Sequence, residues 1–312
     1  MQVEYAEPLS KGYNHMKKAL FQPFDMKKWF IVGFTAFLAG LTDCDNHGGG
    51  GNSGGDGLHS FADILEAPYT AWNWLQDNPG WSMLIFFGIA VLFALYILFT
   101  WISSRGKFMF LDNVVHDRAL IAQPWREFGS LSNSLFIWRL FYGLFCLAII
   151  ISFIVHVWRS AYGLYYDDFN DVPWAFLIRM GLLLLFMILV LSYIDLLLNE
   201  FVVPVMYKNR INVLQAWGLF LEIHWAHFLQ FLFFALIWLV MSVAVVILVI
   251  FAGLLTCCLG FLLLALPYIN TVVLLPVIYT FRSFSLEFLT QFGGKYDVFS
   301  NDQQMAAPHA VG

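Results

Sequence analysis

Long apolar runs, separated by short polar segments, dominate the chain. A helix rises 1.5 Å per residue and the hydrocarbon core of a bilayer is about 30 Å thick, so a span needs about 20 apolar residues. The runs that approach or exceed this length are Trp81–Ile102, Leu140–Val155, Met180–Ile194 and Phe228–Phe281. The last run has 54 residues without a charged side chain or a histidine. A single helix of that length would measure about 80 Å, so we expect two spans with a turn between Gly253 and Gly260.

A further apolar segment, Trp29–Leu41, measures only about 20 Å as a helix and is short for a full crossing. The charges around it favour a crossing, because Lys and Arg stay on the cytoplasmic side. Five lysines precede it, whereas the segment Thr42–Gly80 contains six acids and no Lys or Arg. The later connections alternate in the same way. This pattern predicts six spans with both termini in the cytoplasm.

The composition supports a membrane protein. Of the 312 residues, 60% are hydrophobic and 12% charged, about half the charged share of an average soluble domain. This excludes a soluble globular protein and a disordered chain, and the net charge of −5 argues against nucleic-acid binding. The four cysteines have neither disulfide nor metal-site spacing, and we expect no cofactor. The first 28 residues lack the apolar core of a cleavable signal peptide, so the first apolar segment is expected to direct insertion.

The N-terminal segment predicts an amphipathic helix. Leu9, Tyr13, Met16 and Leu20 share one helix face, and lysines lie elsewhere on the wheel. Such a helix lies on an anionic membrane surface, or alternatively packs on the cytoplasmic ends of the spans. The cations expected to contact anionic lipid here and at the inner ends of later spans are Lys11, Lys17, Lys18, Lys27, Lys28, Arg210 and Arg282.

The segment after Trp29–Leu41 is predicted to lie outside the cell. Residues 43–57 form a Gly-rich, flexible loop, and residues 58–80 form interfacial helices that end in a turn at Asp77–Gly80. The chain thus divides into a cytoplasmic interfacial helix (1–28), a membrane domain (29–282) and a cytoplasmic tail (283–312).

Two short motifs recur and indicate an internal repeat. Pro-Val-x-Tyr-x-x-Arg occurs at Pro204–Arg210 and at Pro276–Arg282, and Trp-x-x-Phe at Trp125–Phe128 and Trp217–Phe220. We expect three parallel units, each an amphipathic helix followed by an outgoing and a returning helix. Packing is the first interpretation of the repeat, and a pathway along its axis, as in parallel-repeat transporters, is the second.

Polar residues near the span ends are the candidates for function, because ionisable groups inside spans are costly. The candidate polar pathway or interhelical pair consists of Arg139, Asp195, Asn199 and His227. Asp195 and Asn199 share a face at i, i+4, and Asp195 is expected to pair with Arg139. The centre of every predicted span lacks ionisable groups, and no catalytic, phosphate-binding or metal motif is found. We therefore expect no enzyme activity, no catalytic residue and no metal site.

Three segments resemble a family of uncharacterised six-span bacterial membrane proteins. They are Met16–Trp29 with its Lys-Lys-Ala-Leu-Phe-x-Pro-Phe-Asp pattern, the run Ser104–Asp112, and Asn133–Arg139. More remotely, the chain is similar to the membrane domain that is fused to glycerophosphodiester phosphodiesterases. The resemblance implies six helices in a bacterial cytoplasmic (inner) membrane. It carries over no hydrolase activity and no site residue, because the catalytic domain is absent from this sequence.

The sequence thus predicts an all-α, non-enzymatic, multi-pass protein that acts as a scaffold or accessory subunit of a larger membrane assembly. Its expected partners are the lipid bilayer and either other membrane subunits or copies of itself. One alternative is a transporter or channel for lipids or small solutes. A second is a protein that organises the membrane surface or its curvature through its interfacial helices.

Overall fold

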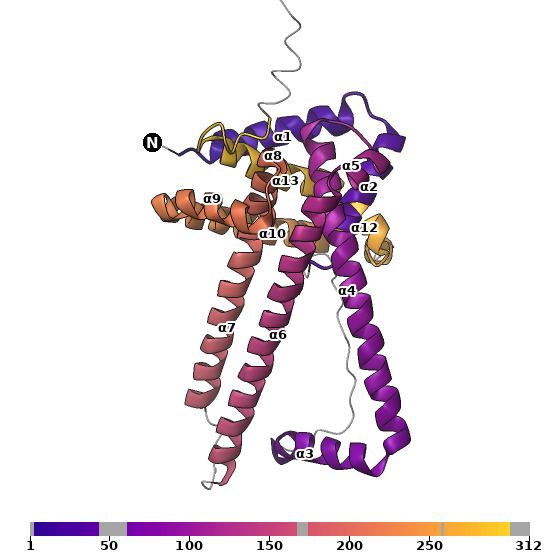
Figure 1. The fold of residues 1–312 in the computed structure, drawn as a ribbon, viewed down its shortest axis with the longest axis vertical. Helices are drawn as coiled ribbons and strands as arrows, with labels where there is room; N and C mark the ends of the chain where they lie inside the picture. Colours follow the sequence, from indigo (N-terminus) through magenta and orange to yellow (C-terminus); the bar gives the residue numbers. More distant parts are fainter. Residues whose placement is uncertain (1–2, 44–60, 167–173, 257–258, 300–312) are drawn as a thin grey trace, which may run out of the picture. The chain divides into compact units, whose positions relative to one another are not determined.

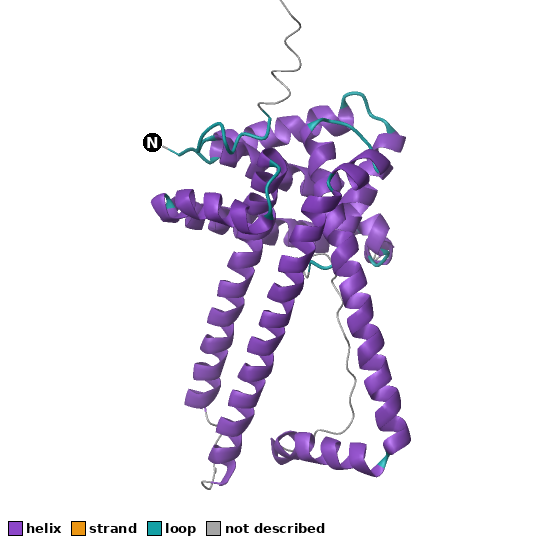
Figure 2. Ribbon diagram, viewed as in Figure 1, coloured by secondary structure: helices purple, strands orange, loops and turns teal. Residues whose placement is uncertain are grey.

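The computed structural model describes residues 3–43, 61–166, 174–256 and 259–299. In these ranges every regular element is a helix and none is a strand (Figure 2). In chain order (Figure 1) they are α1 (Ala6–Phe21), α2 (Met26–Ala39), α3 (Phe61–Asp77), α4 (Pro79–Val115), α5 (Ala122–Glu127), α6 (Gly129–Tyr166), α7 (Trp174–Leu197), the π-helix η2 (Leu198–Val202), α8 (Val203–Asn209), α9 (Val213–Ala226), α10 (Phe228–Leu255), α11 (Leu259–Leu264), α12 (Pro267–Val273) and α13 (Leu275–Thr290). The predicted Gly-rich loop lies almost entirely outside the described residues.

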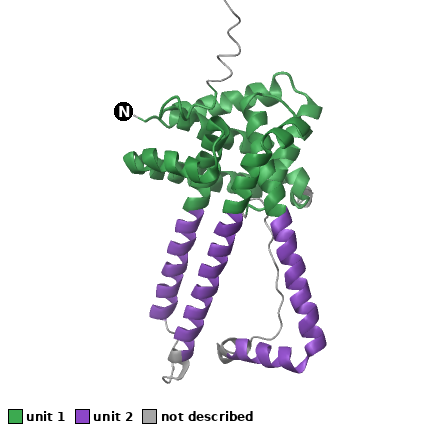
Figure 3. Cartoon of the chain, viewed as in Figure 1, with its two compact units in different colours: residues 1–48, 99–138, 193–312 green, residues 49–98, 139–192 purple. Residues whose placement is uncertain are grey.

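The helices fall into two compact units (Figure 3). Unit 1 comprises residues 1–48, 99–138 and 193–312, and unit 2 comprises residues 49–98 and 139–192. Three long helices, α4, α6 and α7, contribute residues to both units. Each unit is described by itself below.

Four of the described helices are long and apolar enough to cross a membrane, namely α4, α6, α7 continued through α8, and α10. The pair α12 and α13 adds a fifth if it is counted as one span, bent by 64°. The described helices are thus those of a membrane protein, but the predicted six spans are not confirmed. The differences lie at the first apolar segment, because α2 has only 14 residues, about 21 Å of helix, and at the last, where α12 and α13 form a bent pair.

The 54-residue apolar run breaks where a turn is expected. Helix α10 ends at Leu255, and the Thr256 hydroxyl lies 3.1 Å from the Ala252 carbonyl oxygen and 3.0 Å from the Gly260 amide nitrogen. This hydroxyl satisfies backbone groups that the end of a helix leaves open. The next long helix begins only at Leu275, after the short helices α11 and α12.

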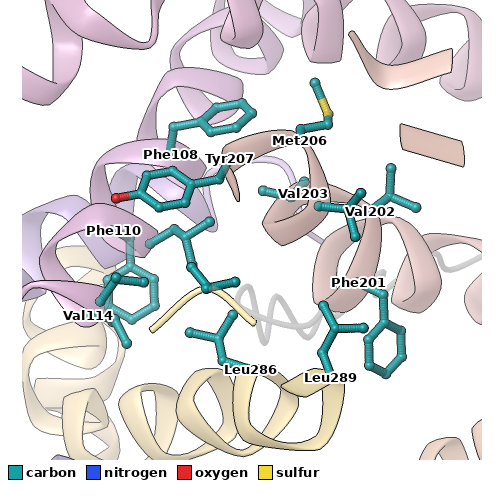
Figure 4. Packing of buried hydrophobic residues seen from close by; sticks show 14 of the residues in the cluster. Phe108, Phe110, Val114, Phe201, Val202, Val203, Met206, Tyr207, Leu286 and Leu289 are labelled. Atoms are coloured by element: carbon teal, nitrogen blue, oxygen red, sulfur yellow. The ribbon is translucent and has the colours of Figure 1, made fainter. Parts of the chain in front are cut away.

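The end of α4 forms the centre of unit 1. Phe108, Met109, Leu111 and Val114 are fully buried, and Phe110 is almost so. A helix that is apolar on every side must be covered on every side, and in Figure 4 the side chains of α4, η2, α8 and α13 surround one core. Parallel ring stacking strengthens this packing: Phe128 stacks on Phe108 and Phe220 stacks on Phe201. Each pair joins a predicted Trp-x-x-Phe motif to the core, although the repeat itself stays a prediction.

Helix α2 packs alongside this buried end of α4. An added Cβ on Gly106 would lie 2.5 Å from the backbone of Leu38 and Ala39, so the two helices touch through their backbones. The Ser103 hydroxyl donates to the Ala39 carbonyl oxygen at 2.7 Å, and the Lys107 ammonium lies 2.6 Å from the Asp43 carboxylate. Both contacts satisfy groups at the carboxyl end of α2. The segment expected to be a first span is thus held along residues 103–115 of α4.

Helix α1 packs along α13, which is the second of the two placements that the sequence allows. Gly12 lies against the α13 backbone, where an added Cβ would be 2.8 Å from the Phe284 nitrogen. Met16 and Leu20 are buried, whereas Tyr13 of the predicted apolar face is half exposed. The lysines of α1 lie on the outer face. Contact of this outer face with an anionic membrane stays a prediction.

In unit 2, α6 and α7 are joined by a hydrogen bond from the Tyr142 hydroxyl to the Leu191 carbonyl oxygen, at 2.7 Å. On α4, Tyr96 sits against Gly143 of α6, where any larger residue would displace it. Helix α3 comprises most of the residues that are expected to form external interfacial helices. It ends at Asp77, and the Asn78 side chain donates to the Trp74 carbonyl oxygen at 2.9 Å before α4 begins.

Gly106→Ala should destabilise the protein, because the new methyl group has no space between α4 and α2. We expect a loss of about 1–3 kcal/mol, seen as a lower thermal unfolding midpoint of the detergent-solubilised chain. Gly88→Ala is the matched control, since Gly88 lies in the same helix with no atom within 4 Å of an added Cβ. It should change stability by less than about 0.5 kcal/mol. Equal effects of the two substitutions would contradict the close packing of α2 on α4.

Candidate functional site

A buried carboxylate lies at the end of α4 and organises the first of two polar clusters in unit 1. Asp112 is 1% exposed. The Arg118 guanidinium donates to it through Nε at 3.1 Å and Nη2 at 2.8 Å, and the Tyr207 hydroxyl donates at 2.9 Å. A buried charge is tolerated only when it is paired and hydrogen-bonded. We call Asp112, His116, Arg118 and Tyr207 the Asp112 cluster.

Local backbone geometry brings Arg118 back onto α4. The Asn113 side chain pairs with the backbone of Leu120, accepting from its N–H at 2.9 Å and donating to its carbonyl oxygen at 3.0 Å. Asp117 adopts a left-handed conformation with φ of 50°, which reverses the chain, and its carboxylate lies 2.8 Å from the Lys28 ammonium. This turn thus brings together an acid and an arginine that are six residues apart.

His116 completes the Asp112 cluster. Its Nδ1 lies 3.3 Å from both the Tyr207 hydroxyl and the Asp112 carboxylate. The ring can donate to the carboxylate when protonated, or accept from the phenol when neutral. The cluster can therefore store or pass a proton, but the carboxylate oxygens already accept bonds from protein groups. Our first interpretation is that the Asp112 cluster holds α8 against α4.

The second cluster surrounds the π-helix η2. In a π-helix the hydrogen-bond ladder shifts by one residue, and here the Asn199 carbonyl oxygen accepts from Arg282 Nη1 at 2.6 Å. Glu200 lies 3.4 Å from the same guanidinium and accepts from the Ser285 hydroxyl at 2.5 Å. The Asn199 amide donates to Asp195 at 2.9 Å. We call these five residues the Glu200 cluster, and it joins α7 and η2 to α13.

Some polar atoms of the Glu200 cluster and its neighbours are buried without a hydrogen-bond partner among the described residues. They include Arg282 Nε, Asn199 Oδ1, Ser283 Oγ and His224 Nδ1. Such atoms are rare in folded proteins because each costs free energy. Together with the π-helix, a feature that often marks functional positions, they make the Glu200 cluster the better candidate for a site that accepts a small polar group.

The family of the chain follows from a comparison with protein-family models. Residues 5–299 match one model, described as a family of unknown function (DUF7544). The chain belongs to the DUF7544 family. No curated protein and no solved structure matches it. In this DUF7544 protein the predicted similarity to the membrane domain of glycerophosphodiester phosphodiesterases has no support from the comparisons and stays a prediction.

The structure brings together only part of the predicted polar site of this DUF7544 protein. Asp195 and Asn199 are hydrogen-bonded, as their spacing predicts. His227 ends α9, and its ring centroid lies 5.4 Å from that of Phe292. Arg139 is buried in α6 and belongs to unit 2, so its pairing with Asp195 stays a prediction. Asp112 was not among the predicted site residues, although an acid within the apolar run Phe108–Val115 is a signal that sequence could offer.

The predicted lipid-contacting cations occupy different environments. Lys11, Lys17, Lys18 and Lys27 are exposed, and Lys11 pairs with Glu7 at 2.7 Å. Arg210 is half exposed, pairs with Glu127 at 2.6 Å and stacks on the Phe128 ring. Arg282 differs from the prediction. It is buried because η2 presents a carbonyl oxygen and a carboxylate to it, so its guanidinium contacts protein instead of lipid phosphate. No group of three potential metal ligands occurs within the described part of the chain.

Tyr207→Phe should destabilise the DUF7544 protein more than Tyr279→Phe, although both positions lie in the Pro-Val-x-Tyr-x-x-Arg motif. The Tyr207 hydroxyl binds a buried carboxylate, whereas the Tyr279 hydroxyl donates to the Val114 carbonyl oxygen at 3.2 Å. We expect losses of about 1.5–3 and about 0.5–1.5 kcal/mol in chemical unfolding of the solubilised protein. A larger loss for Tyr279→Phe would contradict the charged state assigned to Asp112.

The stability should also fall in mild acid because of His224. Burial lowers the pKa of His224 below its ordinary value near 6.5, and aromatic rings from Tyr193, Phe220, Phe228 and Phe231 surround it. Below pH 6.5 the unfolded chain therefore binds a proton that the folded chain does not, and stability decreases as the pH falls. His224→Gln should flatten this part of the stability profile, measured by unfolding midpoints between pH 7.5 and 5. His227→Gln is the control, and an unchanged slope in His224→Gln would refute the assignment.

Proposed function

We propose that this DUF7544 protein is a non-enzymatic, multi-pass scaffold or accessory subunit of a larger membrane assembly. One observation carries the proposal. In each of the four candidate spans, at most 11% of the residues in the most apolar stretch of 18 are buried by the rest of the chain. Most residues of these stretches thus keep some apolar surface that lipid or helices of other subunits can cover.

The contrast with the end of α4 supports partner helices in addition to lipid. Residues 103–115 are packed on all sides, whereas Leu182, Phe186 and Leu189 of α7 are each more than half exposed along one helix face. Gly181 lies in the same helix with no atom within 4 Å of an added Cβ. Small residues allow close approach between membrane helices, so this part of α7 suits a neighbouring span.

The chemistry of the buried clusters supports a structural role. Asp112 and Glu200 each pair with an arginine and accept a hydroxyl hydrogen bond. A nucleophile or general base needs a lone pair that is directed at a substrate, and here these lone pairs are directed at protein groups. The clusters thus serve to hold the span ends in one rigid unit.

The charge distribution supports the proposed orientation. Lysines precede α2, and the following segment up to Gly80 is acidic and lacks Lys and Arg. By the positive-inside rule we place both termini in the cytoplasm, and we propose the inner membrane of a bacterium because the sequence resemblance implies it. Three parallel units with six crossings belong to the same proposal.

Native mass measurement in mild detergent should show species heavier than the 35.8 kDa chain, either self-associated or with co-purified subunits. Gly181→Ile should shift the distribution toward the monomer, because the larger side chain keeps a neighbouring helix away from α7. Leu185→Ile, an exposed and volume-conserving change in the same helix, should leave the distribution unchanged. A monomeric wild type that moves a solute across liposomes would instead support the transporter alternative and refute the scaffold.

A further inference from the structure

The junction between α1 and α2 exposes a group of apolar side chains. Phe21, Phe24, Met26 and Phe30 are 44–60% exposed. Phe21 and Phe24 pack on Trp29, with ring centroids 5.3 and 5.4 Å from the indole, so their positions are fixed by packing. We call these four exposed residues the apolar tip. Large apolar groups held in place and exposed together mark a surface that is covered by another apolar phase.

A hollow of about 320 Å³ lies beside the apolar tip. It is lined by Asp25, Lys27, Lys28, Ile31, Asp117, Arg118 and Ala119. We call it the basic hollow, because three of these side chains are cations and two are acids. It joins the amino end of α2 to the loop that carries Asp117 and Arg118.

Both acids of the basic hollow are already engaged. Asp25 accepts from the Lys27 backbone N–H at 2.8 Å, and Asp117 pairs with the Lys28 ammonium at 2.8 Å. Arg118 donates to Asp112 through Nε and Nη2. Its Nη1 does not take part in these hydrogen bonds to Asp112. None of the ion pairs among the described residues includes the Lys27 ammonium. Two cationic donors of the hollow are thereby left for an anion from outside.

The apolar tip and the basic hollow are adjacent on α2. Met26, Phe30 and Phe34 follow one another at intervals of one helical turn and form an exposed apolar stripe. Lys27 and Ile31 lie on the neighbouring face, at the edge of the basic hollow. Lys27 and Phe30 are three residues apart, about 4.5 Å along the helix. This is the order of charge and apolar surface found where headgroups meet acyl chains.

We propose that the basic hollow binds the phosphate of an anionic phospholipid, with an acyl chain lying along the apolar stripe of α2. Lys27 and Arg118 Nη1 bind the phosphate, and Met26 and Phe30 contact the chain. A free phosphate would use the basic hollow alone and leave the apolar tip in water, which favours a lipid as the ligand. The site requires only a membrane location and does not depend on the proposed subunit role.

Native mass spectrometry of the full-length, detergent-solubilised protein tests the proposal. Phosphatidylglycerol should bind more tightly than phosphatidylcholine with the same acyl chains. Lys27→Gln should weaken phosphatidylglycerol binding about fivefold, the effect of one lysine near an anionic headgroup, at an unchanged unfolding midpoint. Lys11→Gln, which removes an exposed lysine of α1 paired with Glu7, should have no effect. Equal binding of the two lipids, or equal effects of the two substitutions, would overturn the proposal.

The apolar contact separates a lipid from a soluble phosphate. Met26→Ser should weaken phosphatidylglycerol binding but leave the binding of glycerol 3-phosphate unchanged, because only the lipid reaches the stripe. If glycerol 3-phosphate binds as tightly as the lipid, or if Met26→Ser affects neither ligand, the basic hollow is a site for soluble phosphate and the lipid proposal fails.

Discussion

The structure of unit 1 depends on the neutralisation of one carboxylate at the end of α4. A charge buried to 1% exposure among phenylalanines costs much free energy unless it is paired. Arg118 supplies the opposite charge and Tyr207 the remaining hydrogen bond. Once Asp112 is satisfied, residues 103–115 can be covered on every side, and α2, α8 and α13 pack around them. The polar pairing and the apolar packing therefore depend on each other.

The core and the candidate spans place their apolar side chains differently. The core of unit 1 buries rings and aliphatic side chains, whereas few residues in the most apolar stretches of the four candidate spans are buried, including those of α10 in unit 1. A chain with this division keeps its helix ends in a fixed arrangement and leaves its spans available to the bilayer and to neighbours. Charged residues near the span ends lie in the packed part of the chain, and this is why they are bound to protein partners.

Much of the helical organisation could be predicted from sequence, because apolar run length and turn residues are local properties. The spans at α4, α6, α7 and α10 and the break near Thr256 follow from them. The packing of α2 was not predictable in this way, since it depends on Gly106, Ser103 and Lys107, more than 60 residues away. For the candidate site, the Asp195–Asn199 contact followed from helix spacing. The pairing of Arg282 with Glu200 could not be predicted, because it depends on a π-helix that no pattern in the sequence indicates.

The sequence separation within each ion pair has a consequence for the order in which the protein is made. Arg118 leaves the ribosome six residues after Asp112, so this carboxylate acquires its counter-charge almost as soon as it is synthesised. Glu200 is 82 residues from Arg282, and its partner arrives only with the last long helix. Until then the nascent chain lacks the arginine that contacts this acid of η2. Helix α13 therefore completes the Glu200 cluster last, and a chain truncated before residue 282 lacks this contact.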